Sequence, residues 1–188
     1  SSSRTQFNSR RGGFRPVAYE FRFGAEGEAP AFRIPLDGGR ELLNRMLNAG
    51  RVGAAAESVG VAGGAFDMTT AYLKQRKQFG QLIGEFQALQ HRAAHLYSEV
   101  EIARAAVIKA QQLLDAGSEK ADLMVSVAKA KAGKAAGLAV REGVQLHGGI
   151  GMTDEYDIGL YMKRDRALAE FMGDLYYHAD RVAKMSGY

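Results

Sequence analysis

The segment Arg76-Lys77-Gln78-Phe79-Gly80 separates two long stretches of helical periodicity and so decides how the chain is organised. Apolar residues recur at helical spacing from about residue 39 to 75, and again from about residue 84 to 116. We therefore expect the segment to close one long amphipathic helix and to open another. Arg76 has two interpretations, because the helix dipole favours an arginine in a last turn and a guanidinium fork also suits a pyrophosphate.

A second segment, Gln145-Leu146-His147-Gly148-Gly149-Ile150-Gly151, closes a third helix predicted from about residue 119 to 146. Its glycines follow a helix rather than a strand and have the wrong spacing for a dinucleotide fingerprint, which excludes a Rossmann fold. The segment is either a plain helix stop or a turn whose amides approach a phosphate. With a last helix from about residue 159 to 185, the pattern predicts an all-α, up-down four-helix bundle.

Residues 1–37 form a separate arm ahead of the bundle predicted for residues 38–188. Apolar and polar residues alternate from Val17 to Phe23, which predicts a strand, and Ala31 to Leu36 can supply a second. The glycine-rich stretch between them is turn material, so a short β-hairpin and two loose extended segments fit equally well. A two-stranded piece is marginal alone, so we expect it to pack against something else.

The formal net charge of +4 comes from residues 1–15 of the arm. The remaining residues carry 21 basic and 21 acidic side chains, because four arginines and no acid lie within residues 1–15: Arg4, Arg10, Arg11 and Arg15. Without an aromatic platform, this pattern favours a solvated tail over a nucleic-acid-binding arm.

The longest uncharged apolar run, Val59 to Phe66, is far shorter than the roughly 20 residues of a membrane span. The chain has no cysteine, and no apolar stretch follows Ser1 as it would in a secretory signal. We expect a cytoplasmic protein without a membrane segment. His91, His95 and Glu99 share a helix face, but no further ligands are evident and no metal site is predicted.

Arg164-Asp165-Arg166 begins a charged face of the last helix that continues through Glu170 and Asp174. Such a face is usually solvated. In a ligand-lined bundle, the same carboxylates could remove a proton next to a thioester, which requires a dry site.

Residues from about Arg51 to Val182 resemble the carboxy-terminal helical domain of flavin-dependent acyl-CoA dehydrogenases. The markers are the two segments quoted above, together with Phe86-Gln87-Ala88-Leu89-Gln90 between them and Arg164-Asp165 after them. The order and spacing of the four markers make the resemblance more specific than any single motif.

The resemblance implies an enzyme that binds FAD and oxidises an acyl-CoA thioester to the 2-enoyl-CoA. It removes the α-proton, transfers the β-hydride to the flavin and passes electrons to an electron-transferring flavoprotein. The residues expected to contact the FAD adenosine and pyrophosphate of a neighbouring subunit are Arg76, Gln78, Phe79, Gln145, Gly148 and Gly149.

The sequence departs from the family where the catalytic base is expected. The usual glutamate follows the Arg-Asp pair by eight residues, which is Gly173 here, and the alternative position on the first helix, before Arg51, is Gly50. Asp174 and Glu170 are the nearest carboxylates, so we take them as candidate bases. Arg51 is a candidate substrate-binding residue.

The family's amino-terminal helical domain and middle β-domain do not fit into the first forty residues. We therefore expect a fragment or a short relative, inactive when isolated, whose arm is a remnant of the middle domain. We also expect a homodimer or tetramer, or a hetero-oligomer. Two alternatives stay open: a non-catalytic subunit that supplies FAD contacts and oligomer surface, and a DNA-associated flavoprotein of the same fold.

Overall fold

The computed structural model describes residues 19–21, 32–34 and 39–188, and the four arginines of residues 1–15 lie outside this range. Strand β1 (Tyr19–Phe21) pairs with β2 (Phe32–Ile34) in antiparallel register. Of the two arrangements that the sequence leaves open, the hairpin is therefore the one observed. The chain divides into compact units of residues 1–45 and 46–188, and the predicted boundary at residues 37 and 38 stays a prediction.

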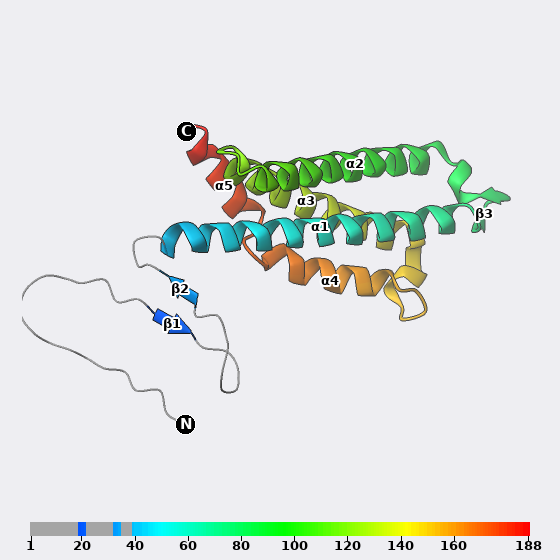
Figure 1. Cartoon of the computed structure of the whole chain (residues 1–188). Coiled ribbons are helices and arrows are strands. Elements are labelled where there is room, and N and C mark those ends of the chain that lie inside the picture. The colour runs from blue at the N-terminus through cyan, green and yellow to red at the C-terminus, as the bar shows by residue number, and fades with distance from the viewer. Residues whose placement is uncertain (1–18, 22–31, 35–38) are drawn as a thin grey trace, which may run out of the picture. The chain divides into compact units, whose positions relative to one another are not determined.

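The bundle consists of three long helices and a fourth that is divided in two (Figure 1). The helices are α1 (Gly39–Leu73), α2 (Gln87–Asp115), α3 (Ala121–His147), α4 (Ile158–Glu170) and α5 (Leu175–Met185). The predicted all-α, up-down four-helix bundle is confirmed. Within the described residues, none of these helices has both the length and the apolar composition that a bilayer crossing requires.

The predicted last helix, residues 159–185, is wrong as a continuous element. It breaks between α4 and α5, where Met172 and Gly173 have φ values of 64° and 102°. These angles belong to the left-handed region and cannot continue a right-handed helix. The apolar period carries on across the break, which is why the sequence pattern did not reveal it.

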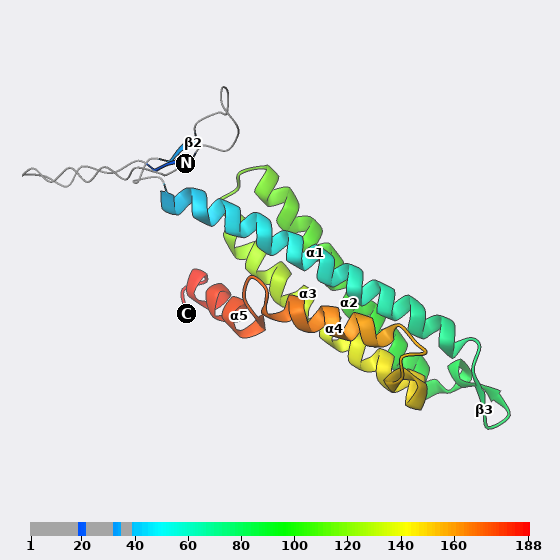
Figure 2. The same cartoon turned by 90° about the horizontal axis from the view of Figure 1, so that it is seen from below.

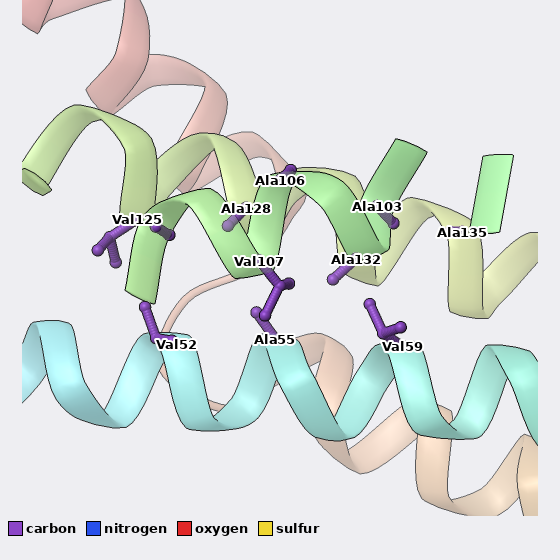
Figure 3. Packing of buried hydrophobic residues seen from close by; sticks show 11 residues of the cluster. Val52, Ala55, Val59, Ala103, Ala106, Val107, Val125, Ala128, Ala132 and Ala135 are labelled. Atoms are coloured by element: carbon purple, nitrogen blue, oxygen red, sulfur yellow. The ribbon is translucent and has the colours of Figure 1, made fainter. Parts of the chain in front are cut away.

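The core is built mainly from alanine and valine (Figure 3). One cluster joins α1, α2 and α3 through Val52, Ala55, Val59, Ala103, Ala106, Val107, Ala110, Val125, Ala128, Ala132 and Ala135. Small side chains let helix backbones approach closely, as the alanine content of α3 predicts.

Helix α4 lies against glycines of two other helices. A Cβ atom at Gly143 of α3 would stand 2.6 Å from Ile158 Cδ1, and one at Gly64 of α1 would stand 2.6 Å from Tyr161 Cε1. Neither distance is tolerable for a real side chain, so these glycines are required by packing. At Gly64, the missing side chain permits close contact between α1 and α4.

Candidate functional site

A hairpin presents the first marker segment at one end of the bundle. Strand β3 (Lys77–Gln78) pairs with β4 (Gln81–Leu82), and the φ values of 52° at Phe79 and 83° at Gly80 are those of a type I′ turn. The segment lies between α1 and α2, as expected from the sequence, but it is part of neither helix, because strand pairing interrupts the helical period. A phenylalanine replaces the asparagine or aspartate that usually signals such a turn.

Three predicted cofactor residues of this segment are exposed. Arg76 and Gln78 face solvent, and Phe79 is 92% exposed, with its ring edge-on to Phe86 at a centroid distance of 6.2 Å. A non-glycine residue at positive φ is strained, and an exposed aromatic side chain gains nothing from solvent. The combination indicates a surface shaped for contact with a ligand or partner.

The second marker segment leaves backbone open to a ligand. Gln145 is exposed near the end of α3, and Gly148 and Gly149 begin the short 3₁₀ helix η3 (Gly148–Met152). Apart from the adjoining residues, no atom of the described residues lies within 4 Å of where a Cβ atom of either glycine would stand. A phosphate or other flat group could therefore approach these two peptides closely.

His147 lies behind this turn and is almost fully buried. Its Nδ1 lies 2.7 Å from the Gly143 carbonyl oxygen, and its ring stacks on Tyr72 at 4.5 Å. Its Nε2 is buried and makes no hydrogen bond within the described residues. The His147 ring also lies 5.0 Å from the Tyr156 ring, centroid to centroid, so it belongs to an aromatic cluster with Tyr72 and Tyr156.

The two marker segments, about 65 residues apart in sequence, meet at this end of the bundle. Leu73 at the end of α1, Ile83 after the hairpin and Leu146 beside the glycine turn form one buried cluster. The Ile83 amide also donates to the Arg76 carbonyl oxygen at 2.9 Å. All six predicted cofactor residues thus belong to two segments held together by one apolar cluster.

The break between α4 and α5 contains the position where the family's glutamate is expected. A Cβ atom at Gly173 would stand 2.4 Å from Tyr177 Cδ1 and 3.0 Å from His178 Nε2. At Gly50, the other customary position, it would stand 2.8 Å from Met172 Cε. Neighbouring side chains therefore occupy the space that a base at either position would need.

The two candidate bases lie on either side of this break. Asp174 is the N-cap of α5, and its Oδ1 accepts a hydrogen bond from the Tyr177 amide at 2.7 Å. Glu170 is exposed at the end of α4. Both line a cavity of about 250 Å³ whose opposite wall, on α3, carries the basic side chains Lys129, Lys134 and Arg141.

Lys129, on α3, holds the backbone of the break in place through two hydrogen bonds. It is 2% exposed, and its Nζ donates to the carbonyl oxygens of Leu168 and Gly173, each at 3.0 Å. Burial lowers the pKa of Lys129, while the carboxylates of Asp174, Asp165 and Glu170 oppose that change. One hydrogen bond satisfies a carbonyl in the last turn of α4, and the other satisfies a carbonyl of the break itself.

His178 is fully buried beside Gly173. Its Nε2 lies 3.0 Å from the Met172 carbonyl oxygen, and its Nδ1 has no hydrogen-bond partner within the described part of the chain. Burial lowers the pKa of His178 to about 4, and the nearby cations of Lys129, Arg51 and Arg181 also lower it. The imidazole is therefore neutral at physiological pH.

Arg51, the candidate substrate-binding residue, is 4% exposed and lies next to the break. Its guanidinium donates to Asn48 Oδ1 at 3.1 Å and to the Tyr177 hydroxyl at 3.0 Å. Burial lowers the pKa of Arg51, and the positive charge of Arg181 lowers it further, whereas Tyr177 and Asp122 raise it. The side chain belongs to a polar network that links α1 to α5.

The break and the hairpin lie far apart along the bundle (Figures 1 and 2). Arg51 and the end of α1 at Leu73 are separated by 22 residues of continuous helix, which corresponds to about 33 Å at 1.5 Å per residue. The predicted cofactor residues and the candidate bases therefore form two distinct sites within this chain.

Comparison with known proteins identifies the family. The family model described as "Acyl-CoA dehydrogenase, C-terminal domain" matches residues 37–186. The chain belongs to the acyl-CoA dehydrogenase family. The match covers the whole bundle and both marker segments, so the resemblance noted from the sequence is confirmed.

Curated and solved members of the acyl-CoA dehydrogenase family match along the same region. The short/branched chain specific acyl-CoA dehydrogenase of Bos taurus is 38% identical over 138 residues, which are 73% of this chain and 32% of that protein. Acyl-CoA dehydrogenase IpdE2 of Mycolicibacterium smegmatis is 43% identical over 119 residues, covering 63% of this chain and 36% of its own length. The chain thus matches about a third of the length of these relatives.

Among solved structures, butyryl-CoA dehydrogenase from Megasphaera elsdenii superposes with a TM-score of 0.76. The superposition covers 82% of this chain and 42% of that one, at 26% sequence identity. The bundle therefore has the fold of the matching part of that enzyme.

Sequence reasoning missed the residues that shape the break. Tyr177, Arg181 and Lys129 were not singled out, because their importance depends on contacts between helices. Lys129 carried a detectable signal, since it follows the apolar face of α3 between Val125 and Ala132 at helical spacing. Tyr177 and Arg181 carried none beyond a position on a charged helix.

Proposed function

We propose that this chain acts as the carboxy-terminal domain of an FAD-dependent acyl-CoA dehydrogenase, which oxidises an acyl-CoA thioester to the 2-enoyl-CoA. The observation that supports the proposal most directly is the meeting of the two marker segments around Leu73, Ile83 and Leu146. Segments so distant in sequence have no local reason to present exposed polar side chains and open glycine peptides together.

The residues at the hairpin end fit the dinucleotide half of FAD. Arg76 and Gln78 supply donors for a pyrophosphate, Gly148 and Gly149 offer uncovered peptides, and Phe79 offers an exposed ring for stacking. When bound, the flavin accepts the β-hydride of the acyl group. Because the hairpin lies about 33 Å from the break along α1, we propose that it reaches the cofactor of a neighbouring subunit.

At the other end, the acyl group lies against the break between α4 and α5. In this proposal, Asp174 or Glu170 accepts the α-proton, and the electron pair left on the α-carbon forms the double bond as the β-hydride leaves. Asp174 has to do so while it caps α5, since its Oδ1 already accepts from the Tyr177 amide. Arg51 lies beside the acyl group and orients Tyr177.

A second candidate function is favoured by the crowding at the customary base positions. Tyr177 and Met172 occupy the space beside Gly173 and Gly50, which supports a non-catalytic subunit that contributes FAD contacts and oligomer surface to an active partner. Exposed apolar side chains on α2, including Tyr97, Ile102 and Ile108, suit subunit packing in either case. We propose a cytoplasmic homo- or hetero-oligomer that transfers its electrons to an electron-transferring flavoprotein.

The experiment that tests the proposal is an anaerobic titration of the full-length flavoprotein with straight-chain and branched acyl-CoA thioesters, followed by flavin absorbance. Bleaching by one thioester establishes the dehydrogenase. The variants Asp174→Asn and Glu170→Gln then identify the base. Flavin reduction is lost when the true base is replaced by its amide and is retained when the other carboxylate is replaced. A bound flavin that no thioester reduces, but that bleaches after an active homologous subunit is added, supports the non-catalytic subunit instead.

A further inference from the structure

Two guanidinium groups approach one tyrosine ring beside the break. The Cζ of Arg51, on α1, lies 5.8 Å from the centroid of the Tyr177 ring, and the Cζ of Arg181, on α5, lies 5.9 Å from it. Both distances are in the range of cation–π contacts. The arrangement concentrates positive charge around a single side chain.

Neither arginine has a carboxylate partner within ion-pair distance among the described residues. Arg51 donates to the neutral groups of Asn48 and Tyr177, and its Nε is buried without any hydrogen bond. Arg181 donates from Nε to the Ser126 hydroxyl at 3.1 Å. One carboxylate, that of Asp122, acts on Arg51 through Asn48, whose amide donates to it. Two guanidinium groups thus face a single acid, so an anion bound here would balance the second positive charge.

The Tyr177 hydroxyl is prepared to bind that anion. Its oxygen accepts a hydrogen bond from Arg51, so its own proton is free to be donated, and a bond from a cation makes the hydroxyl a stronger donor. Tyr177 is 44% exposed. An incoming ligand can therefore reach it without unfolding any helix.

The position of this cluster suggests what the anion belongs to. Tyr177 fills the space beside Gly173, so the protein supplies no side-chain carboxylate there. We propose that Tyr177, Arg51 and Arg181 form an anion site that binds a carboxylate carried by the acyl group of the substrate. This assignment rests on the proposed function, in which the acyl group lies against the break between α4 and α5.

Two thioesters of equal chain length test the site. Pentanoyl-CoA and glutaryl-CoA differ in whether the far end of the acyl group is a methyl or a carboxylate. Dissociation constants are measured by calorimetry on the full-length flavoprotein, at low and at physiological ionic strength. We expect glutaryl-CoA to bind roughly tenfold more tightly, the ratio expected for one charge-assisted hydrogen bond, and this preference to shrink as salt is added.

Two variants test whether the preference for glutaryl-CoA arises at this site. Arg181→Gln should remove it, and Tyr177→Phe, which deletes only the hydroxyl, should reduce it severalfold, while the affinity for pentanoyl-CoA stays within twofold in both. Lys184→Gln is the matched control, because it removes one positive charge from the same helix at a side chain that pairs with Asp180. Arg51 is left intact because its loss could unfold the domain.

Each outcome decides a different question. Equal binding of the two thioesters by the unmodified protein, or a preference that survives both variants, overturns the anion site. If Lys184→Gln abolishes the preference for glutaryl-CoA as fully as Arg181→Gln does, the preference comes from general surface charge. That result also overturns the anion site. If neither thioester binds and the flavin resists reduction by every thioester, the proposed function itself fails, and the anion site with it.

Discussion

The two ends of the bundle use polar residues in opposite ways. At the hairpin end, the side chains of Arg76, Gln78 and Gln145 are exposed, and they lie on a hairpin and beside a turn that one apolar cluster holds in place. At the break, Lys129 and Arg51 are buried and bonded to groups of this chain.

This difference indicates which end of the bundle depends on a ligand or a neighbouring subunit. The hairpin end presents groups outward and has few internal constraints on them, so its side chains are available to a ligand or a neighbouring subunit. The break is held by the chain itself, because each buried donor stabilises one particular path of the backbone. Mutations should therefore affect stability at the break and binding at the hairpin.

The largest expected effect is that of Lys129→Met. The substitution keeps the aliphatic stem but leaves the Leu168 and Gly173 carbonyl oxygens without their donor, which should lower the free energy of unfolding by about 3 kcal/mol. Urea denaturation measures it. Lys134→Met is the control, since Lys134 is exposed on the same helix and lines the same cavity. A loss below about 1 kcal/mol would mean that the desolvation of the buried ammonium cancels its hydrogen bonds.

The next effect is that of Gly173→Ala, which we expect to cost about 2 to 3 kcal/mol. The added methyl group meets Tyr177 at 2.4 Å, and the φ of 102° is unfavourable for alanine. Gly117→Ala is a matched control, because Gly117 also has a positive φ, of 60°, but no atom within 4 Å of the new methyl group. The difference in thermal stability between the two variants isolates the clash. If Gly117→Ala costs as much, backbone strain alone explains the effect and Tyr177 does not fill the site.

A pH-dependent effect of intermediate size is expected from His178. Because its folded pKa, about 4, lies below the usual value of 6.5, the unfolded state binds more protons between these two values. Stability should therefore fall as the pH decreases from 6.5 to 4, by up to about 3 kcal/mol. Unfolding curves of wild type and His178→Gln across this range measure the contribution, since other groups titrate in both. Parallel pH profiles would contradict the assignment.

The smallest effect on stability is expected at the hairpin tip. Phe79→Ala removes an exposed ring and should change the unfolding free energy by less than about 0.5 kcal/mol. Flavin retention by the full-length protein should nevertheless weaken about tenfold, which equilibrium dialysis measures. Met185→Ala, which removes an exposed apolar side chain from α5, should leave flavin binding unchanged. Equal flavin retention in Phe79→Ala and wild type would remove Phe79 from the cofactor site.

The residues proposed to contact the cofactor could be selected from the sequence because they are adjacent in it. Arg76, Gln78 and Phe79 lie within four residues, and Gln145, Gly148 and Gly149 within five, so the two segments can be found as motifs without knowing how the helices pack. What the sequence did not reveal was the hairpin that carries the first segment. Its turn depends on positive φ values at Phe79 and Gly80, and phenylalanine is not a residue that predicts them.

The residues at the break could not be predicted as a set. Arg51, Lys129 and Tyr177 come from three helices, and each looks like an ordinary polar residue of an amphipathic helix until the helices are placed. Their burial and hydrogen bonds follow from distances across the bundle, which the period of a single helix does not encode. The sequence showed that position 173 has no side chain, but it did not show that Tyr177 occupies the space beside it.

By itself, the sequence determined the helical class of this protein, the approximate bounds of its first three helices, and the motifs that relate it to the acyl-CoA dehydrogenases. These properties depend on local periodicity and on short runs of residues. Only the tertiary structure decided that the last helix breaks and that Lys129 holds the broken ends. It also decided that the arginines of α1 and α5 converge on one tyrosine, because contacts between residues more than a hundred positions apart exist only after the helices pack.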